Sequence, residues 1–195
     1  KLKIYLLRHT SLNVPKDTFY GQTDLDVSDN FDEEVKDIKK KFLVKKVDLN
    51  NLEIFSSPLK RCVKLSEALF NDFKKDIRLK ELNFGDWEMK KFNEISRKKI
   101  QSWENNLMKF QIPNGESNLQ FFDRLKSFCD EVLKNKKDIF IVAHAGSING
   151  IISYISDIPF DTLIKENWKR ISYGSLSLIK KEEKKDKFNL EFFGF

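Results

Sequence analysis

The stretch KIYLLRHT, residues 3–10, decides how the rest of the chain can be arranged. Its four consecutive apolar residues, 4–7, are rich in β-formers and predict a short buried strand of the kind found inside a parallel sheet. The strand ends at Arg8 and His9. Open α/β sheets bind ligands beyond the carboxyl ends of their strands, so a cation and an imidazole there favour an anion site. On this stretch alone, an ordinary loop histidine beside a surface arginine is an equally good interpretation.

A second predicted strand brings the other histidine of the chain to a strand end. Residues 138–143, DIFIVA, form a continuous apolar run that is followed by His144 and then by isoleucines at helical spacing. The chain has only two histidines, and each directly follows a predicted strand. This arrangement favours a functional site over two unrelated loop histidines.

A third predicted strand, residues 52–55, leads into SSPLKR, residues 56–61. Ser57 is a good N-cap and Pro58 a good first helical residue, so Arg61 is expected one turn into a helix. The amino end of that helix would face the same crevice, where it favours anions. We therefore expect two arginines and two histidines to converge at one edge of the sheet.

Five motifs occur along the chain in an order typical of one family. They are RHT at 8–10, SSPLKR at 56–61, ELNFGDWE at 81–88, NGES at 114–117 and HAG at 144–146. In these motifs the chain resembles the histidine phosphatase superfamily, which has the phosphoglycerate-mutase-like fold, and the match spans residues 4–177. Two stretches, YGQTD at 20–24 and FGDWEM at 84–89, are most similar to the α-ribazole-5'-phosphate phosphatases of cobalamin nucleotide-loop assembly.

The resemblance implies both a fold and an activity. We expect an α/β protein, a three-layer α/β/α sandwich with a mostly parallel central sheet. It should form a single domain over residues 1–195, with a lid-like helical insertion around 86–116. The implied activity is that of a phosphomonoesterase that forms a phosphohistidine and hydrolyses α-ribazole 5'-phosphate to α-ribazole and phosphate.

Two other functions are compatible with the same motifs. A broad-specificity phosphatase or a phosphoglycerate-mutase-type enzyme would use the same five residues. A non-catalytic phosphate-binding or phosphohistidine-regulating module is disfavoured because the full set of reactive residues is present.

Phosphoryl transfer needs an in-line nucleophile, cations on the phosphate oxygens and a proton for the leaving oxygen. By resemblance, His9 is the nucleophile, and Arg8, Arg61 and His144 donate to the phosphate. Their positive charges should keep His9 neutral and nucleophilic. Glu81 would protonate the leaving alcohol and then act as base towards water.

Glu81 follows a short strand predicted over residues 77–79 and precedes a tight aromatic loop with Phe84 and Trp87. Poor solvation favours the protonated form of a carboxylate, which suits a general acid. Without the resemblance, Glu81 would be interpreted as a surface residue. Glu116, in the turn before the next helix, is the alternative acid, although a carboxylate there also stabilises the helix dipole.

The long loop over residues 11–29 is expected to carry substrate contacts, because long ordered loops in compact domains are often functional. Tyr20, Gly21 and Gln22 are placed over the phosphate site by resemblance, whereas a purely structural role for Gly21 in a turn is the alternative. The family commonly has Gly where Thr10 stands and Asn where Pro15 stands. Asn13 is the candidate that replaces this missing contact.

The rim of the site is expected to select the substrate. Aromatic and apolar residues of the 20–22 loop, the 87–89 loop and a helix over 92–110 would bind a benzimidazole-like base. Gln22 and Glu88 would then be available for ribose hydroxyls. Extra cations of the kind a small, highly charged substrate needs are absent from these loops apart from Lys90 and Lys91.

Other predicted elements follow from hydrophobic periodicity and caps. One helix is opened by a capping box of Asn30 and Glu33 and should bury Val35, Ile38 and Phe42, and a helix over 58–70 should bury Cys62, Val63 and Leu69. A further helix is opened by Ser117 and should bury Leu119, Phe122, Leu125, Cys129 and Val132. The remaining elements are a helix over 160–168 and strands over 173–179 and 188–193. The charged run 180–187 is expected to be a solvated hairpin connection.

Composition excludes several classes of protein. The 195 residues suit one domain, and 40% hydrophobic residues with 18 Phe support a packed core. The net charge of +6 comes from lysines mixed with Asp and Glu, so we expect no nucleic-acid partner. The family resemblance implies a small phosphomonoester as the ligand. No run is long enough to span a membrane. The oligomeric state is left as monomer or homodimer.

The two cysteines, Cys62 and Cys129, are isolated in the sequence and lack a ligand-spaced partner. We interpret both as reduced core residues of a cytoplasmic protein. Both histidines are already assigned to phosphate chemistry. We therefore expect no metal and no cofactor.

Overall fold

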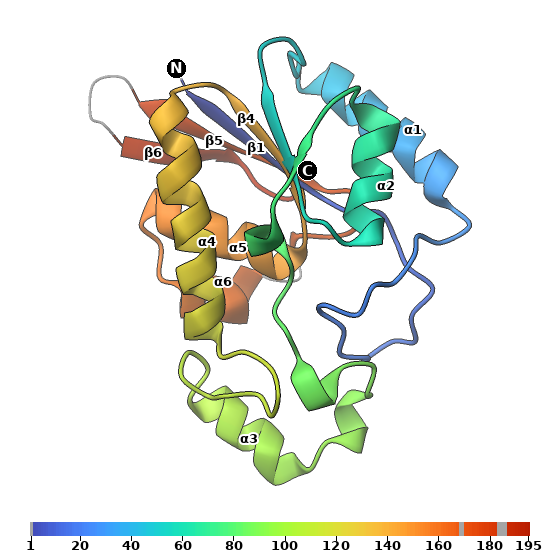
Figure 1. The fold of residues 1–195 in the computed structure, drawn as a ribbon, viewed down its shortest axis with the longest axis vertical. Coiled ribbons are helices and arrows are strands. Elements are labelled where there is room, and N and C mark those ends of the chain that lie inside the picture. The colour runs from blue at the N-terminus through green and yellow to red at the C-terminus, as the bar shows by residue number, and fades with distance from the viewer. Residues whose placement is uncertain (1, 168–169, 183–186) are drawn as a thin grey trace.

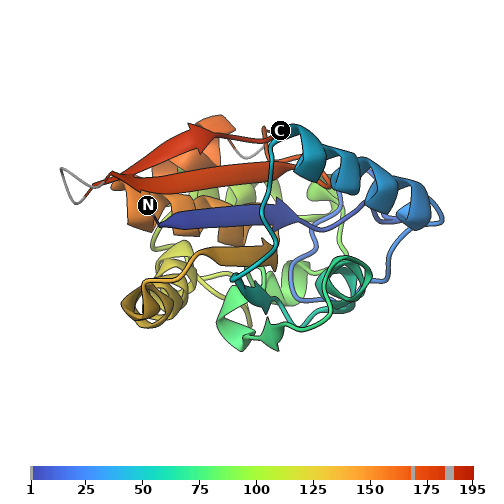
Figure 2. The same cartoon turned by 90° about the horizontal axis from the view of Figure 1, so that it is seen from above.

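The computed structural model describes residues 2–167, 170–182 and 187–195. Their strands form one six-stranded sheet, in which β1 (Lys3–Arg8) lies between β4 (Ile139–Ala143) and β5 (Leu176–Glu182) (Figure 2). The order is β3-β2-β4-β1-β5-β6, with β2 at Glu53–Ser56, β3 at Lys74–Lys75 and β6 at Lys187–Phe192. Strands β3, β2, β4 and β1 pair in parallel, and β5 pairs antiparallel with both β1 and β6. The prediction of a mostly parallel sheet is confirmed.

Both faces of this sheet are covered, which is why its central strands are apolar without alternation. Helices α4 (Asn118–Val132), α5 (Ala145–Ser156) and α6 (Phe160–Asn167) cover one face. Helices α1 (Phe31–Val44) and α2 (Lys60–Leu69) cover the other (Figure 1). The expected three-layer α/β/α sandwich is therefore confirmed.

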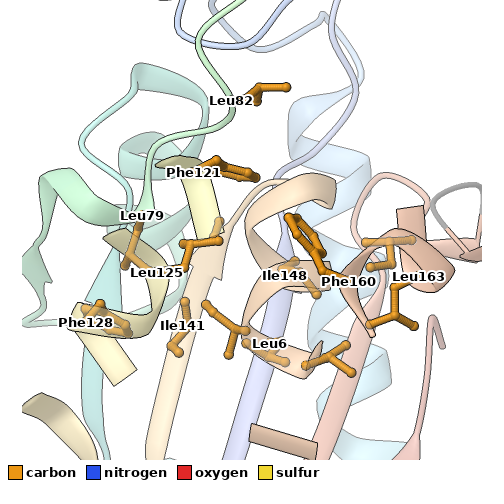
Figure 3. Packing of buried hydrophobic residues seen from close by; sticks show 14 of the residues in the cluster. Leu6, Leu79, Leu82, Phe121, Leu125, Phe128, Ile141, Ile148, Phe160 and Leu163 are labelled. Carbon is orange, nitrogen blue, oxygen red and sulfur yellow. The ribbon is translucent and has the colours of Figure 1, made fainter. Parts of the chain in front are cut away.

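The side chains of β1 divide between the two cores with the strand period of two. Leu6 packs in the core under α4 and α5, whereas Leu7 packs in the core under α1 and α2. Figure 3 shows Leu6 together with Ile141, Leu125 and Ile148, each with at most 1% of its surface exposed. Full burial on both faces fixes the register of β1 against β4, and so the position at which each strand ends.

The parallel strands end at the same edge of the sheet, and the chain continues the ladder slightly beyond them. His9 N donates to Ala143 O at 3.2 Å, and Ser57 N donates to Val142 O at 2.9 Å. The residues after β1, β2 and β4 are thus held side by side by backbone hydrogen bonds.

Two helix starts differ from their predictions. Helix α2 begins at Lys60 with Leu59 as its N-cap, so the expected cap by Ser57 and start at Pro58 are wrong. The Ser57 hydroxyl is instead 2.8 Å from His144 Nε2. Helix α1 begins after Asn30, but the Asn30 side chain makes no capping bond because its backbone, at φ −82° and ψ 3°, is in a turn and not extended.

Residues 77–79 form a 3-10 helix, η1 (Ile77–Leu79), and not the predicted strand. Asp76 accepts a hydrogen bond from Arg78 N, which closes this short turn. The paired strand of this region is the earlier β3. Glu81 therefore does not follow a strand directly, although the chain still brings it to the same edge of the sheet.

The predicted helix over 92–110 is interrupted. It consists of the 3-10 helix η3 (Phe92–Glu94) and of α3 (Arg97–Asn105), which Ser96 caps by accepting a bond from Lys99 N. Ile95 and Ile100 are buried, whereas Phe92 is 45% exposed. Helix α3 lies beyond one end of the sheet, at the bottom of Figure 1.

Burial confirms most of the predicted helix faces. Val35, Ile38 and Phe42 of α1 are buried, as are Cys62 of α2 and the α4 residues Leu125, Cys129 and Val132. The prediction failed for Leu119, which is 42% exposed, because Phe121 and Phe128 occupy the buried side of α4 instead. Val63, Leu69 and Phe122 are only partly buried.

The strands of the carboxyl-terminal hairpin have the predicted lengths but lie at different positions along the chain. The charged run 180–187 is not a simple connection, because β5 extends to Glu182 and β6 begins at Lys187. Residues 183–186 and Trp168, the predicted end of the last helix, lie outside the described residues. Tyr173, assigned to the strand from sequence, precedes β5.

Cys62 and Cys129 are free and buried, as predicted. Burial raises the pKa of the Cys62 thiol to about 12, which keeps it protonated. Among the described residues, no helix is long and apolar enough to cross a membrane.

Candidate functional site

Arg8, His9, Arg61 and His144 converge at the edge where β1, β2 and β4 end, as the sequence predicted. The rings of His9 and His144 have their centroids 5.3 Å apart. Each histidine is 1% exposed, and Arg61 is fully buried. Arg8 is partly buried, so three of these four side chains are withdrawn from water, and the two cations and two imidazoles together can bind an anion.

The tautomer of His9 follows from its hydrogen bond. His9 Nδ1 lies 2.8 Å from Thr10 O, and because a carbonyl oxygen only accepts, Nδ1 carries the proton. Nε2 is then left with a free lone pair. Burial, followed by the charges of Arg8 and Arg61, lowers the pKa of His9 well below its usual value, so the ring is neutral.

His144 is also held neutral. Its pKa is lowered well below the usual value by burial first, and then by the charge of Arg61. Nε2 is 2.8 Å from Ser57 Oγ, whereas Nδ1 is buried and has no hydrogen-bond partner among the described residues. A buried polar nitrogen of this kind is suited to a ligand oxygen.

Arg61 is fixed by the long loop over 11–29. Its guanidinium donates to Thr23 O at 2.8 Å and to Gly21 O at 2.5 Å. Its Nε is buried without a partner within the described part of the chain. Two of its nitrogens thus orient the side chain, and the third is available to an anion.

Arg8 is held by two tyrosines and a carbonyl. It donates to Ile171 O at 2.7 Å and to Tyr20 OH at 3.3 Å, and its guanidinium stacks 4.2 Å from the centroid of Tyr173. The two tyrosine hydroxyls are 2.8 Å apart. Tyr173 was missed because alternation placed it inside a strand. Its position before that strand gave no separate signal.

Glu81 is anchored at the amino end of α5. Its Oε2 accepts from Gly146 N at 2.9 Å and its Oε1 from Leu82 N at 3.1 Å. A Cβ at position 146 would lie 2.2 Å from Glu81 Oε1, which explains the glycine of the HAG motif. The expected contact with Trp87 is not what holds this carboxylate, since Trp87 packs against Phe19 instead.

Hydrogen bonds within the protein hold the loop residues Gly21 and Gln22 against the carboxylate of Glu88. The Glu88 carboxylate accepts from Gly21 N at 2.9 Å, Gln22 N at 2.8 Å and Thr23 Oγ1 at 2.8 Å. It is therefore already satisfied, which corrects its expected role towards ribose hydroxyls. A Cβ at Gly21 would lie 1.7 Å from Leu82 O, so this glycine has a structural role, which is the close approach of two backbone segments and not a special turn dihedral. Gln22 Nε2 donates to Glu81 O at 3.2 Å.

Asn13 is exposed and does not line the cavity beside His9. The alternative acid, Glu116, pairs with Arg124 at 2.8 Å and also lies outside the cavity lining. Of the candidates named from sequence, the structure thus brings together His9, His144, the two arginines, Glu81 and Tyr20.

The cavity above His9 has a volume of about 1020 Å³. Its wall is largely aromatic, and its outer part carries charges of both signs. The aromatic residues are Phe19, Tyr20, Phe84, Phe92, Trp103, Phe121 and Phe160, and the outer charges are Lys16, Asp17, Lys91 and Glu104. Trp87 and Met89 do not line it, so the expected contribution of the 87–89 loop is wrong. Lys16 is a cation that the sequence analysis did not anticipate.

Two polar atoms interrupt this aromatic wall. Asn149 Oδ1 and Thr18 Oγ1 are buried and have no hydrogen-bond partner in the described chain. Asn149 is 1% exposed and lies on α5 one turn beyond Gly146, so it faces the cavity on the same side as the Glu81 anchor. The same described residues contain no group of three or more His, Cys, Asp or Glu that could hold a metal ion.

A sequence model of the histidine phosphatase superfamily (branch 1) matches residues 4–192. The chain belongs to this superfamily. A protein of Hydrogenobacter thermophilus with the provisional name phosphoserine phosphatase 2 is 31% identical over 170 residues, which cover 83% of this chain and 82% of the relative. The superfamily match and the phosphatase relatives together show that the chain is a phosphatase.

Solved structures of other histidine phosphatases share the fold. The α-ribazole phosphatase of Shigella flexneri has a TM-score of 0.83 at 20% identity, covering 100% of this chain and 96% of that one. A mutant phosphoserine phosphatase of Entamoeba histolytica in complex with phosphoserine has a TM-score of 0.80 at 18% identity, covering 100% and 97%. At this identity the likeness establishes the fold alone.

Because both histidines are neutral in the folded protein, we predict that the free energy of unfolding depends on pH. Unfolded histidines take up protons below pH about 6.5, whereas the lowered pKa values keep both folded histidines neutral. The unfolded state then binds more protons, so the free energy of unfolding falls as the pH drops from 7 towards 5.5. The slope should reach about 1.4 kcal/mol per pH unit for each histidine.

Urea unfolding at several pH values measures this slope. The double variant His9→Gln, His144→Gln should lose most of it, because the chain has no other histidine. An unchanged slope in the double variant contradicts the assignment.

Proposed function

We propose that this phosphatase hydrolyses phosphomonoesters through a phosphohistidine at His9, without a metal. The observation that carries the proposal is the neutral, buried His9 with a free Nε2 beside three nitrogens that have no partner in the described chain. Those nitrogens are Arg8 Nε, Arg61 Nε and His144 Nδ1. Together they can donate to the phosphate oxygens as charge builds up on them.

The reaction proceeds in two displacements. His9 Nε2 attacks phosphorus, a P–N bond forms, the ester P–O bond breaks, and the leaving oxygen takes a proton from the Glu81 carboxyl. Glu81 then accepts a proton from water, whose oxygen attacks phosphorus, and the P–N bond breaks to release phosphate and restore His9. Glu81 is suited to both steps because Gly146 N, two residues after His144, holds it.

We propose α-ribazole 5'-phosphate as the substrate, and with it a role in cobalamin nucleotide-loop assembly. The aromatic wall and the volume of about 1020 Å³ support a large, flat leaving group, since such pockets fit ligands of this size. Asn149 and Thr18 supply unpaired polar atoms for ribose hydroxyls, in place of Gln22 and Glu88. The enzyme would act in the cytoplasm, where the free buried thiols stay reduced.

Phosphoserine is the second candidate. It is favoured by the name of the 31% identical relative and by the charges at the outer cavity. Lys16 or Lys91 could pair with its carboxylate, and Asp17 or Glu104 with its ammonium group. A leaving group this small would leave the aromatic wall without a function.

The first prediction tests covalent catalysis. Enzyme mixed with a radiolabelled substrate and quenched should carry acid-labile, base-stable phosphate, as expected for a phosphohistidine. The His9→Ala variant should trap none. Loss of activity in EDTA with recovery on adding a divalent ion would show that the metal-free mechanism is wrong.

The second prediction concerns Glu81. Glu81→Gln should lower kcat about 10²- to 10⁴-fold on an alkyl phosphate, whose leaving oxygen needs a proton. The loss should be much smaller on p-nitrophenyl phosphate, which has a good leaving group. Glu104→Gln, an exposed carboxylate of the same cavity, is the matched control and should change both rates little. Equal losses of Glu81→Gln on both substrates contradict the acid role.

The third prediction compares substrates. The ratio kcat/KM should be highest for α-ribazole 5'-phosphate among a set that includes phosphoserine, 3-phosphoglycerate and p-nitrophenyl phosphate. Phe92→Ala should lower it about tenfold for α-ribazole 5'-phosphate and little for phosphoserine, because only the aromatic base uses that wall. Leu119→Ala, equally exposed but outside the cavity, is the control.

A preference for phosphoserine that Phe92→Ala leaves intact would replace the first candidate with the second. A flat profile would support a broad-specificity phosphatase.

A further inference from the structure

We propose that Arg124 is a positioning residue for this reaction, which fixes the backbone of Glu81 and so the place from which the leaving oxygen receives its proton. The inference rests on the proposed role of Glu81 as the acid. Arg124 belongs to α4 and does not line the cavity. It would therefore act through Glu81 and not by touching the substrate.

Both Nη atoms of the Arg124 guanidinium donate to the segment that contains Glu81, and its Nε donates to Glu116. Nη1 donates to Arg78 O and to Lys80 O, both at 2.7 Å, and Nη2 donates to Glu81 O at 2.9 Å. Nε and Nη2 also form a bidentate pair with the Glu116 carboxylate, at 2.8 and 3.0 Å. One side chain thus gathers three carbonyl oxygens and a carboxylate.

Glu116 extends this hold to the other side of Glu81. Its Oε2 accepts from Asn83 N at 2.8 Å, and its own N donates to Asn83 O at 2.9 Å. The chain is therefore pinned two residues after Glu81 as well as at Glu81 itself. A carboxylate before a helix was expected to serve the helix dipole, but here it binds an arginine.

The segment needs such a hold because it has no regular structure. The 3-10 helix η1 ends at Leu79, and the next one, η2 (Gly85–Trp87), begins at Gly85. The hydrogen bonds found for the Glu81 carboxylate come from the backbone N–H groups of Gly146 and Leu82. Its position relative to His9 depends on where the backbone at Glu81 is placed.

Arg124 connects the segment that contains Glu81 to the packed core. Its guanidinium lies 4.6 Å from the ring centroid of Phe121, which is 1% exposed. The next residue, Leu125, is fully buried, and its Cδ1 is 2.4 Å from where a Cβ on Gly150 of α5 would be. Because α4 packs this closely on α5, Arg124 and Gly146 hold the two ends of Glu81 in one frame.

The chemistry requires arginine at this position. The side chains of Arg124 and Glu116 are each 19% exposed, so the pair is partly desolvated and its geometry matters. A lysine keeps the charge, but its single ammonium cannot form the planar fork that binds a carboxylate and three carbonyls together. Arg124→Lys should keep the Glu81 carboxyl in the site but hold the backbone at Glu81 less firmly, so that the carboxyl is less well positioned.

The test compares two substrates with different leaving groups. Arg124→Lys should lower kcat about 10- to 100-fold on an alkyl phosphate and less than about threefold on p-nitrophenyl phosphate, because only the former needs the positioned proton. Inhibition by inorganic phosphate should stay unchanged, since Arg8 and Arg61 are untouched. In a Glu81→Gln background, Arg124→Lys should add no further loss.

Arg78→Lys is the matched control. Arg78 lies in the same segment and forms ion pairs with Asp76 at 2.7 Å and Glu131 at 2.9 Å, but its side chain makes no bond to Glu81. Its rates should resemble those of the unchanged enzyme. Glu116→Gln is a second, isosteric variant that should show the same dependence on the leaving group to a smaller extent.

A purely structural role predicts different results. Equal losses on both substrates, or a further loss in the Glu81→Gln background, overturn the inference while leaving the acid role of Glu81 intact. If Glu81→Gln itself shows no dependence on the leaving group, the proposed acid is wrong and this inference falls with it. If Arg124→Lys does not fold, the same measurements on Glu116→Gln decide between these outcomes.

Discussion

The structure depends on burying a positive charge that has no carboxylate against it. Arg61 is fully buried, and among the described residues it forms no ion pair. Such a charge is costly unless dipoles or a bound anion offset it. The carbonyls of Gly21 and Thr23 supply the dipoles, and the Glu88 carboxylate in turn holds that loop through its N–H and O–H groups. A phosphate dianion would complete the balance, so the cost of the buried cation becomes affinity for the substrate.

Burial, and then the charge of the arginines, keeps both histidines neutral. A buried imidazolium beside two guanidinium groups would be strongly unfavourable, so the pKa of each ring is lowered. A neutral ring is the form that can attack phosphorus. In the proposed mechanism, the fold prepares His9 as the nucleophile by the same electrostatics that would bind the anion, and no separate base is needed to activate it.

Sequence reasoning located the elements whose signal is local. The apolar runs before His9 and His144 predicted two buried strands, and parallel pairing then required their ends to meet. The sequence predictions were wrong where the position of a side chain depends on a partner far away in the sequence. Ser57 is a good cap by composition, but His144, 87 residues later, engages its hydroxyl. Glu88 looked free for a ligand, but the loop over 21–23 surrounds its carboxylate. Tyr173 carried no motif, and its contacts with Arg8, Tyr20 and His9 in the structure reveal its place in the site.

The site has a phosphate-binding half and a rim that contacts the rest of the substrate. This division explains how phosphatases named for different substrates can share one fold. The phosphate half is built on strand ends and on the start of α5, whose positions are fixed by two cores. The rim is built from two loops that pair with each other: Phe19 N donates to Lys90 O at 2.9 Å, and Met89 N donates to Phe19 O at 2.7 Å. Phe19 then packs between Phe84 and Trp103, so the first loop and α3 share one aromatic cluster. A change in either loop must therefore alter the cavity wall as a unit, while the chemistry below it, anchored elsewhere, stays the same.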